Sequence, residues 1–314
     1  MPAAPTAALT GEPLDLRRVR LVFLGLSVAI LLASLDQTIL STALPTIVAE
    51  LDGVSAMSWV VTAYVLAATI VMPLYGRLGD LVGRRPLFLA AIGLFLLGSV
   101  VGGFAQGMPE LVVGRFVQGL GGGGMVITAQ ALVADVIPPR QRAAYLGVLG
   151  GVFAVSSVAG PLLGGFFVDG PGWRWAFWIN LPVGGAALLA CALTLPRPTG
   201  PRHRPRIDGA GMALLAVGVT SLVLLSGWAG STYAWGSPQV LGCGLLAVAS
   251  GVALVVVERR ATEPVLPPTL FTDRTFVTAT AAGLLLAVAC SARSATCRRS
   301  CRRWPGTAPP RPAC

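Results

Sequence analysis

Long apolar stretches, separated by short polar connections, run along almost the whole of this 314-residue chain. A helix needs about 20 consecutive apolar residues to cross a hydrocarbon layer about 30 Å thick. Eight stretches meet this requirement, at residues 21–43, 57–75, 87–105, 110–134, 144–168, 175–195, 208–229 and 238–257. A ninth apolar run begins near Phe276 and ends after about Ala289, so it is too short to span a membrane by itself. The pattern therefore predicts an all-α integral membrane protein with a partial ninth helix.

The composition agrees with lipid as the main solvent. Hydrophobic residues make up 54% of the chain and charged residues only 11%, against about 25% charged residues in a typical soluble domain. The net charge of +10 is also compatible with nucleic-acid binding. Nucleic-acid-binding proteins gather their basic residues in a patch or stripe on one soluble face, and this chain does not. We therefore expect the lipid bilayer, and not nucleic acid, as its partner.

The arginines occur in every second connection between the predicted helices. These connections hold Arg17, Arg18 and Arg20, then Arg77, Arg84 and Arg85, then Arg140 and Arg142, then Arg197, Arg202, Arg204 and Arg206, and finally Arg259, Arg260 and Arg274. The intervening connections hold one arginine, Arg174, against the acidic Glu50, Asp52, Glu110 and Asp169. Basic residues accumulate in the cytoplasmic connections of membrane proteins. We therefore expect the N-terminus and residues 76–86 on the cytoplasmic side of the cell membrane.

Residues 76–86, GRLGDLVGRRP, hold one aspartate and three arginines in eleven positions. Topology alone explains the arginines, because any short cytoplasmic connection is expected to carry them. It does not explain Asp80 or the three glycines, since acidic residues add little to topology and glycine weakens helices. An aspartate that pairs with a neighbouring helix would act as a latch between two states.

Five positions of this segment resemble the signature between helices 2 and 3 of the major facilitator superfamily: Gly76, Asp80, Gly83, Arg84 and Arg85. In that family this loop is a cytoplasmic gate, and its aspartate pairs across the two halves of the transporter when the protein faces outward. The resemblance implies that Asp80 and Arg84 form the gate pair.

Further segments resemble the same family and narrow the assignment. In LVVGRFVQGLGGGG (111–124) the matching residues are Arg115, Gln118 and Gly119, and in residues 147–165 they are Gly147, Gly151, Gly160, Pro161, Gly164 and Gly165. The other two segments are LDQTILSTALPTI (35–47) and WRWAFWINLPVG (173–184). Together they resemble the fourteen-helix drug/proton antiporter branch, which inserts two helices between two six-helix halves. The resemblance implies a kinked, tightly packed fifth helix that seals the transport path.

Two of these segments also have alternative interpretations. Gly119, Gly121 and Gly124 satisfy the pattern G-x-G-x-x-G of dinucleotide-binding proteins, but no predicted strand precedes them, so we reject that interpretation. Small residues spaced four apart on the fifth helix are also what ordinary packing between membrane helices uses. That alternative stays open at this point.

Asp36 and Arg115 are the charged residues that most require an explanation, because a charge inside a spanning helix costs about 2.5–3.5 kcal/mol on the insertion scale. Arg115 lies about 7 Å inside the fourth predicted helix, so it can also extend its guanidinium to the surface. Asp36 lies about 12 Å from the same side of the membrane. At these depths the two side chains can pair, with Gln37 and Gln118 as polar neighbours. We expect this group to form the proton-coupling and substrate path.

The function that the resemblance implies is proton-coupled antiport, which exports hydrophobic or cationic drugs as Asp36 takes up and releases a proton. Alternating access would pair helices 1–3 with 4–6 as inverted repeats. A metabolite or signal-molecule exporter of the same superfamily is the near alternative. An intramembrane enzyme is the distant one, because the single histidine, His203, lies in a Pro-rich linker and no hydrolase motif occurs. We expect no catalytic residues, metal or cofactor.

The domain organisation follows from these segments. We expect a cytoplasmic N-terminal tail at 1–20, a six-helix transporter bundle at 21–195, a cytoplasmic linker at 196–207, an inserted helix pair at 208–257, a cytoplasmic loop with the partial ninth helix at 258–289, and an aberrant, disordered tail at 290–314. The N-terminal segment carries no small-residue cleavage site after its helix, so we expect a tail and not a removable signal peptide.

The segment 290–314 departs from the rest, since it holds six of the 23 arginines and four of the six cysteines. Its cysteine spacing fits no common zinc pattern, and its basic cluster can also contact anionic lipids. The chain contains no lysine, as expected of a GC-rich coding sequence, and misreading such a sequence yields Arg, Pro, Ala, Gly and Cys. We therefore favour a change of reading frame. On this hypothesis the chain is truncated and cannot transport by itself, since alternating access needs a second helix bundle.

Overall fold

The computed structural model describes residues 16–195, 209–229 and 233–258, together with 274, 276–283 and 285. The predicted linker at 196–207, the tail at 290–314 and most of the N-terminal tail lie outside the described residues. Residues 276–283 of the predicted partial ninth helix are helical. Most of its remaining residues lie outside the described ones.

Nearly all of the described residues are helical. The elements are α1 (Leu16–Glu50), η1 (Val54–Ala56), α2 (Met57–Val82), α3 (Arg84–Phe104), α4 (Met108–Val136), α5 (Pro139–Asp169), α6 (Trp175–Trp178), α7 (Asn180–Thr194), α8 (Gly209–Trp228) and α9 (Pro238–Glu258). Eight spans in the described part of the chain are long and apolar enough to cross a membrane, with α6 and α7 forming one of them. The predicted all-α membrane fold with eight spans is therefore confirmed.

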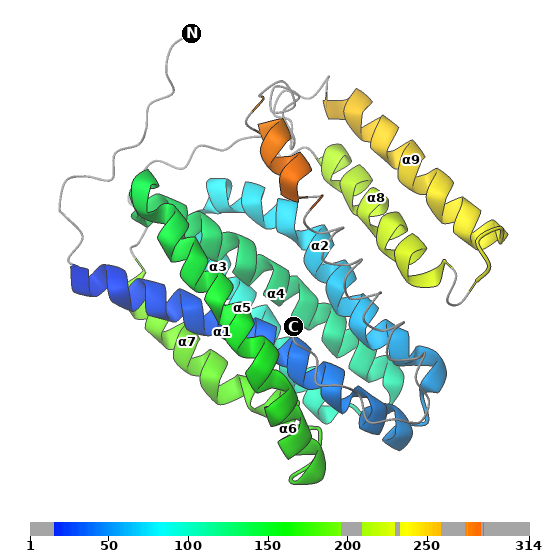
Figure 1. Ribbon diagram of the computed structural model, residues 1–314, viewed down its shortest axis with the longest axis horizontal. Helices are drawn as coiled ribbons and strands as arrows, with labels where there is room; N and C mark the ends of the chain where they lie inside the picture. The colour runs from blue at the N-terminus through cyan, green and yellow to red at the C-terminus, as the bar shows by residue number, and fades with distance from the viewer. Residues whose placement is uncertain are drawn as a thin grey trace, which may run out of the picture.

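Helices α1 to α7 form one bundle, and α8 and α9 lie side by side next to it, along α2 (Figure 1). An edge-to-face contact between Trp59 of α2 and Trp228 of α8, with ring centroids 5.9 Å apart, links the pair to the bundle. Few side chains of α8 and α9 are buried in the protein, as expected of helices that face lipid.

The glycine-rich part of α4 packs closely against two helices. A Cβ at Gly121 would overlap the backbone of α3 at Phe95, and a Cβ at Gly123 would overlap the backbone of α2 at Ala68. Small residues allow helix backbones in membranes to approach in this way. The G-x-G-x-x-G pattern in α4 is therefore a packing surface, and no β-strand element precedes it among the described residues.

The first predicted helix end was wrong. α1 continues beyond residue 43, through Pro45, to Glu50. Asp36 is therefore 14 residues, or about 21 Å, from the end of α1 and not about 12 Å. Proline removes one backbone hydrogen bond, but this long helix continues past it.

The predicted connection at 76–86 is also shorter than expected. α2 continues past Pro73 to Val82, α3 begins at Arg84, and Gly83 alone joins them. Gly83 adopts φ 100° and ψ 144°, a region of backbone space that is open to glycine and costly for other residues. Asp80 consequently lies in the last turn of α2 and not in a loop.

The sixth predicted helix is interrupted. It divides into α6 and α7 at Ile179, which separates one helical turn from the longer segment. Pro182 has no N–H to donate to the carbonyl of Trp178, which weakens the helix at this point. The break places Asn180 at the first position of α7.

Candidate functional site

A buried ion pair lies at the centre of the bundle. Arg115 on α4 donates a hydrogen bond from Nη1 to Oδ2 of Asp36 on α1. Arg115 is 0% exposed and Asp36 is 3% exposed. The alternative in which Arg115 extends to the surface is therefore wrong, because the carboxylate holds its guanidinium inside the bundle.

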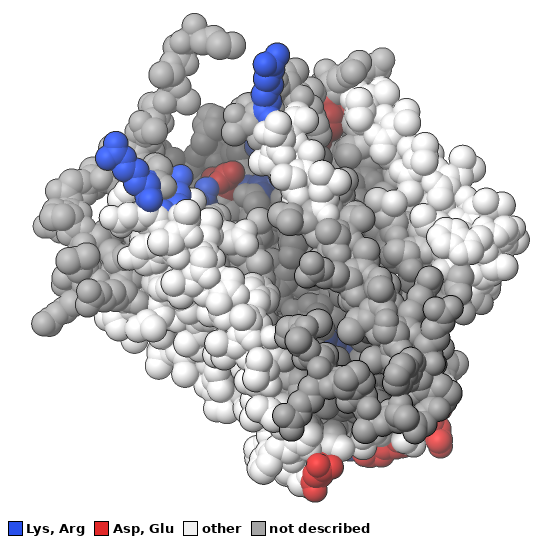
Figure 2. Space-filling model, in the orientation of Figure 1, with Lys and Arg blue, Asp and Glu red and all other residues white. Residues whose placement is uncertain are grey.

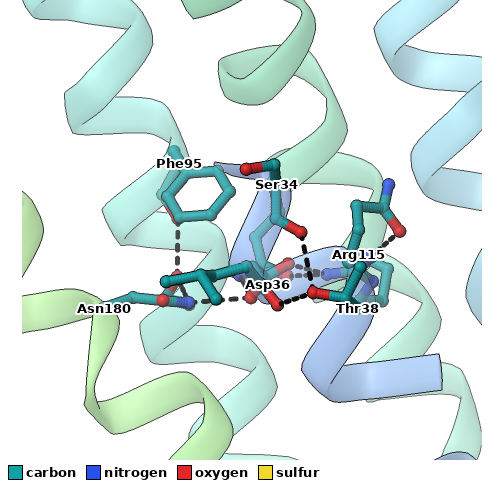
Figure 3. Close-up of polar contacts among 10 residues, drawn as sticks. Ser34, Asp36, Thr38, Phe95, Arg115 and Asn180 are labelled. Atoms are coloured by element: carbon teal, nitrogen blue, oxygen red, sulfur yellow. Dashed lines mark hydrogen bonds and ion pairs between the residues drawn. The ribbon is translucent and has the colours of Figure 1, made fainter. Parts of the chain in front are cut away.

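The other oxygen of Asp36 accepts hydrogen bonds from two amides. Gln118 donates from Nε2 at 3.1 Å, and Asn180 donates from Nδ2 at 2.8 Å. Figure 3 shows Arg115 and Asn180 reaching Asp36 from different helices. Helices α1, α4 and α7 are thereby joined at one carboxylate.

The predicted neighbours of the pair are also in contact with it. Arg115 donates from Nη1 to Oε1 of Gln118 at 2.7 Å and from Nη2 to Oε1 of Gln37 at 3.1 Å. Its guanidinium carbon lies 4.5 Å from the ring centroid of Tyr64 on α2, within the range of a cation–π interaction. The planar fork of arginine can make several such contacts at once.

Ser99 on α3 completes the network. Its hydroxyl accepts from Gln118 at 2.8 Å and from Asn180 at 3.1 Å, and it donates to the carbonyl of Phe95 at 3.0 Å. The amide groups and the Arg115 Nη1 and Nη2 atoms around the carboxylate therefore have partners, which is what a polar group in a low-dielectric interior needs. Nε of Arg115 is buried without one.

Sequence reasoning missed three members of this network: Tyr64, Ser99 and Asn180. Asn180 had the strongest signal, because it is a polar residue beside Pro182 within a predicted span, and polar residues within spans often mark functional positions. Ser99 and Tyr64 are residue types that do not stand out in a membrane helix, so they gave no comparable signal. Helix phase alone could not place them beside Asp36.

A second charged group lies where α2 meets α3. Arg84 donates from Nη2 to Oδ1 of Asp80 at 3.2 Å and pairs through Nη1 with Oδ1 of Asp135 at 2.5 Å. Arg84 Nη1 also donates to the carbonyl of Ala131 at 2.6 Å. The structure thus brings together the Asp80 and Arg84 named from the sequence, and adds Asp135 from the end of α4.

The other predicted residues of this segment divide into two groups. Arg85 donates from Nη2 to the carbonyl of Ala192 at 2.5 Å, which ties α3 to the end of α7. Gly76 lines a groove of about 370 Å³ with Asp80 and Arg84, and a Cβ at Gly76 would contact nothing within 4 Å. The space beside Gly76 is therefore open in the protein.

The glycines of α5 fall into two groups, those packed against α1 and those beside open space. Gly160 and Gly164 lie against α1, where a Cβ would overlap Thr38 and approach Ile39 and Thr42. A Cβ at Gly147, Gly151 or Gly165 would contact nothing within 4 Å. The prediction of a tightly packed helix therefore holds only for the face of α5 that meets α1, since its other face is largely exposed.

Pro161 lies inside α5, and polar contacts at Ser156, five residues before it, join α5 to α1. The hydroxyls of Ser34 and Ser156 lie 2.5 Å apart, and Thr38 donates to the carbonyl of Ser156 at 3.1 Å. Ser34 and Thr38 flank Asp36 in α1 and are drawn with it in Figure 3. The register between α1 and α5 is thus set by polar contacts as well as by glycines.

The two ends of the bundle differ in charge. At the end opposite Arg84, Glu50 accepts from Arg174 Nη1 at 2.6 Å and from Trp173 Nε1 at 2.8 Å. Figure 2 shows basic side chains, with a few acidic ones among them, toward one end of the visible face and mainly acidic ones at the other. The acidic end holds Glu50, Asp52, Glu110 and Asp169, as the sequence order of the spans requires.

Comparison with known proteins then decides the family. Residues 26–211 match the family model described as the Major Facilitator Superfamily. The chain belongs to this superfamily. Its members are membrane transporters, and the described helices form a multi-pass membrane protein of that kind.

Members of the superfamily from several organisms are similar to this chain. An uncharacterised transporter of Mycobacterium tuberculosis is 45% identical over 278 residues, which cover 87% of this chain and 40% of that protein. The multidrug transporter protein MdtP of Bacillus subtilis is 40% identical over 270 residues, covering 85% of this chain and 49% of that protein. The chain thus spans about half the length of the curated relatives that it matches.

Solved structures support the fold. The human organic anion transporter MFSD10 superposes with a TM-score of 0.55 at 21% sequence identity, covering 71% of this chain and 59% of that one. The proton:xylose symporter XylE superposes with a TM-score of 0.51 at 15% identity, covering 77% of this chain and 54% of that one. At this identity the likeness concerns the helix arrangement alone.

Proposed function

We propose that this chain is the N-terminal part of a proton-coupled antiporter of the fourteen-helix branch, which exports hydrophobic or cationic drugs. The observation that carries the proposal is the Asp36–Arg115 pair, which is buried in the bundle and whose carboxylate accepts hydrogen bonds from amides of α4 and α7. Multidrug transporters and efflux pumps among the relatives, at about 40% identity, support the substrate class.

Asp36 is the proton-binding group in this proposal. An ionised Asp36 balances the fixed charge of Arg115, and a proton on Asp36 leaves that positive charge unbalanced inside the bundle. Because uncompensated charge in a low-dielectric interior is costly, proton binding favours a rearrangement of the helices around the pair. A cationic substrate near Asp36 would replace the proton, which couples export to proton entry.

Asp80, Arg84 and Arg85 form the cytoplasmic gate in this proposal, with Gly76 and Gly83 as the glycines that shape it. Arg84 already bridges α2 and α4, and the groove beside Gly76 leaves Asp80 accessible. α8 and α9 would be the inserted pair of the branch. The protein would lie in the cell membrane with its N-terminus in the cytoplasm.

The test is efflux from cells that lack their own drug pumps. Cells that express a full-length transporter with this chain as its N-terminal part should accumulate less of a fluorescent lipophilic cation than control cells, and collapsing the proton gradient should abolish the difference. Asp36→Asn should abolish it as well, whereas Asp52→Asn, at an exposed acid outside the network, should not. Dye exclusion that survives Asp36→Asn, or that does not depend on the gradient, would contradict the proposal.

A further inference from the structure

Asn180 has an unusual position in the network around Asp36. It is the first residue of α7, directly after the break at Ile179, and it is 1% exposed. Its Nδ2 group donates to Oδ1 of Asp36 at 2.8 Å and to Ser99 at 3.1 Å. Both N–H groups of the amide are therefore used.

The charge state of Asp36 dictates how this amide is oriented. An ionised carboxylate can only accept hydrogen bonds, so each amide beside it must present its NH₂ group. A protonated carboxyl group has an O–H to donate and needs an acceptor. The other amide, Gln118, cannot supply that acceptor, because its oxygen accepts from Arg115 at 2.7 Å and reversal would direct an NH₂ group at the guanidinium.

Asn180 is not restricted in this way, since it makes no hydrogen bond with Arg115 in the described network. The charged and titratable groups near Asp36 are Arg115 from α4 and Tyr64 from α2. The polar side chains that α3, α5 and α7 contribute near this part of α1 are uncharged: Ser99, Ser156 and Asn180. The amide of Asn180 is thus the group near Oδ1 that can donate to the ionised form of Asp36 and accept from the protonated form.

We propose that Asn180 is a positioning residue that follows the proton on Asp36. It donates to the carboxylate from Nδ2, and when Oδ1 takes a proton from a hydronium ion, which leaves as water, the amide turns over and accepts the new O–H with its own oxygen. No other covalent bond changes in this step. The inference rests on the proposed function, because it assumes that Asp36 exchanges a proton.

The reversal has a consequence for helix packing. Turning the amide removes the N–H that Asn180 donates to Ser99, which weakens one contact between α7 and α3. Asn180 lies at the break between α6 and α7, where the backbone is already interrupted. Protonation of Asp36 would therefore loosen α7 from α3 at the point where the helix can bend.

The chain itself offers a direct measurement. Asn180 is the only asparagine in the 314 residues, so selective ¹⁵N labelling of asparagine gives one side-chain NH₂ signal in a two-dimensional NMR spectrum. Aspartate labelled with ¹³C in the carboxyl group reports the eight aspartates in the same sample, and the Asp36 signal is the one that is missing when Asp36 is replaced by Leu. We expect the Asn180 signal to change with pH in one transition, with the same midpoint as the Asp36 carboxyl carbon.

The control removes the titrating group without adding an asparagine. In an Asp36→Leu, Arg115→Leu variant, which leaves no unpaired charge, the pH-dependent change of the Asn180 signal should be lost. Ser99→Ala should keep the transition, because Asn180 still contacts Asp36. The wild-type measurement tests the proposal even if the double variant does not fold.

The two possible failures are distinguishable. An Asp36 carbon that titrates while the Asn180 signal stays constant would overturn the role of Asn180 and leave the proposed function intact. An Asp36 carbon that does not titrate while the protein stays folded would overturn proton coupling through Asp36, and the role of Asn180 with it.

Discussion

Arg84 Nη1 lies 2.5 Å from Oδ1 of Asp135, so the first residue of α3 is tied to the last turn of α4. This pair is shorter than the 3.2 Å contact between Arg84 and Asp80 in α2. Asp135 is also less exposed than Asp80, with 45% against 60% of its side chain accessible. The end of α4 therefore holds Arg84 more firmly than Asp80 does.

Asp135→Asn should therefore destabilise the protein more than Asp80→Asn. Because both pairs are partly exposed, we expect a loss of about 1 kcal/mol for Asp135→Asn and less for Asp80→Asn, and both losses should shrink at high salt. Thermal unfolding of the purified variants in one detergent checks the order. A larger effect at Asp80 would show that the Arg84–Asp135 pair does not anchor this end of the bundle.

The helix count was predictable from the sequence because lipid imposes a minimum apolar length on each span. The helix ends were less predictable. Pro45 and Pro73 are residues at which a helix commonly ends, yet α1 and α2 continue past both because tertiary packing supports them. Pro182 does interrupt its helix, and the sequence alone did not distinguish the three cases.

The Asp36–Arg115 pair allows a double-mutant test. Arg115→Leu should destabilise the protein by about 3–5 kcal/mol, because it leaves a buried carboxylate without its counter-charge. Asp36→Leu combined with Arg115→Leu should cost clearly less than Arg115→Leu alone, since neither charge remains. Unfolding by a denaturing detergent gives the free energies.

Additive effects in that cycle would contradict the pairing. If the double variant lost as much stability as the sum of the two single variants, Asp36 and Arg115 would act independently. Gln37→Leu serves as a control and should cost far less, because Gln37 is uncharged and accepts one hydrogen bond from Nη2 of Arg115 at 3.1 Å.

Gly83 gives a prediction about backbone conformation. Gly83→Ala should destabilise the protein by about 1–3 kcal/mol, because an alanine at φ 100° is strained. Gly76→Ala is the matched control seven residues earlier, where the glycine is helical and a Cβ contacts nothing within 4 Å. There we expect no loss of stability, or a gain of up to about 1 kcal/mol from helix propensity. Melting temperatures compare the two, and equal effects would remove the special role of Gly83.

Gly121 gives the corresponding prediction for helix packing. A methyl group at Gly121 would overlap the backbone of α3, which cannot move without separating two helices, so Gly121→Ala should lower expression and thermal stability. Gly151→Ala on α5 meets open space and should be tolerated. Tolerance of both substitutions would contradict the close packing of α3 on α4.

The site was predictable to the extent that charges are costly in lipid. Asp36 and Arg115 stood out because each lies within an apolar span, and Gln37 and Gln118 followed from their neighbourhood. The contacts of Asn180 and Asp135 could not be predicted, because their partners lie on helices more than 40 residues away in the chain. Only the packing of the helices brings such residues together.

The charge difference between the two ends leads to a prediction of membrane orientation. The end with the α2–α3 junction carries Arg77, Arg84, Arg85, Arg140 and Arg142, whereas the opposite end carries mainly acidic residues. Basic residues remain on the cytoplasmic side during insertion. We therefore expect the α2–α3 junction and the start of α1 in the cytoplasm.

Single cysteines test this orientation in a variant whose six natural cysteines are replaced by serine or alanine. Val82→Cys lies at an exposed position, 45% accessible, at the end of α2. Gly170→Cys lies at the opposite end, directly after α5. A membrane-impermeant maleimide applied to intact cells should label position 170 and should reach position 82 only after the membrane is permeabilised. Asp52→Cys, in the other connection at the acidic end, should behave like position 170. Labelling of position 82 in intact cells, with positions 52 and 170 protected, would establish the reverse orientation.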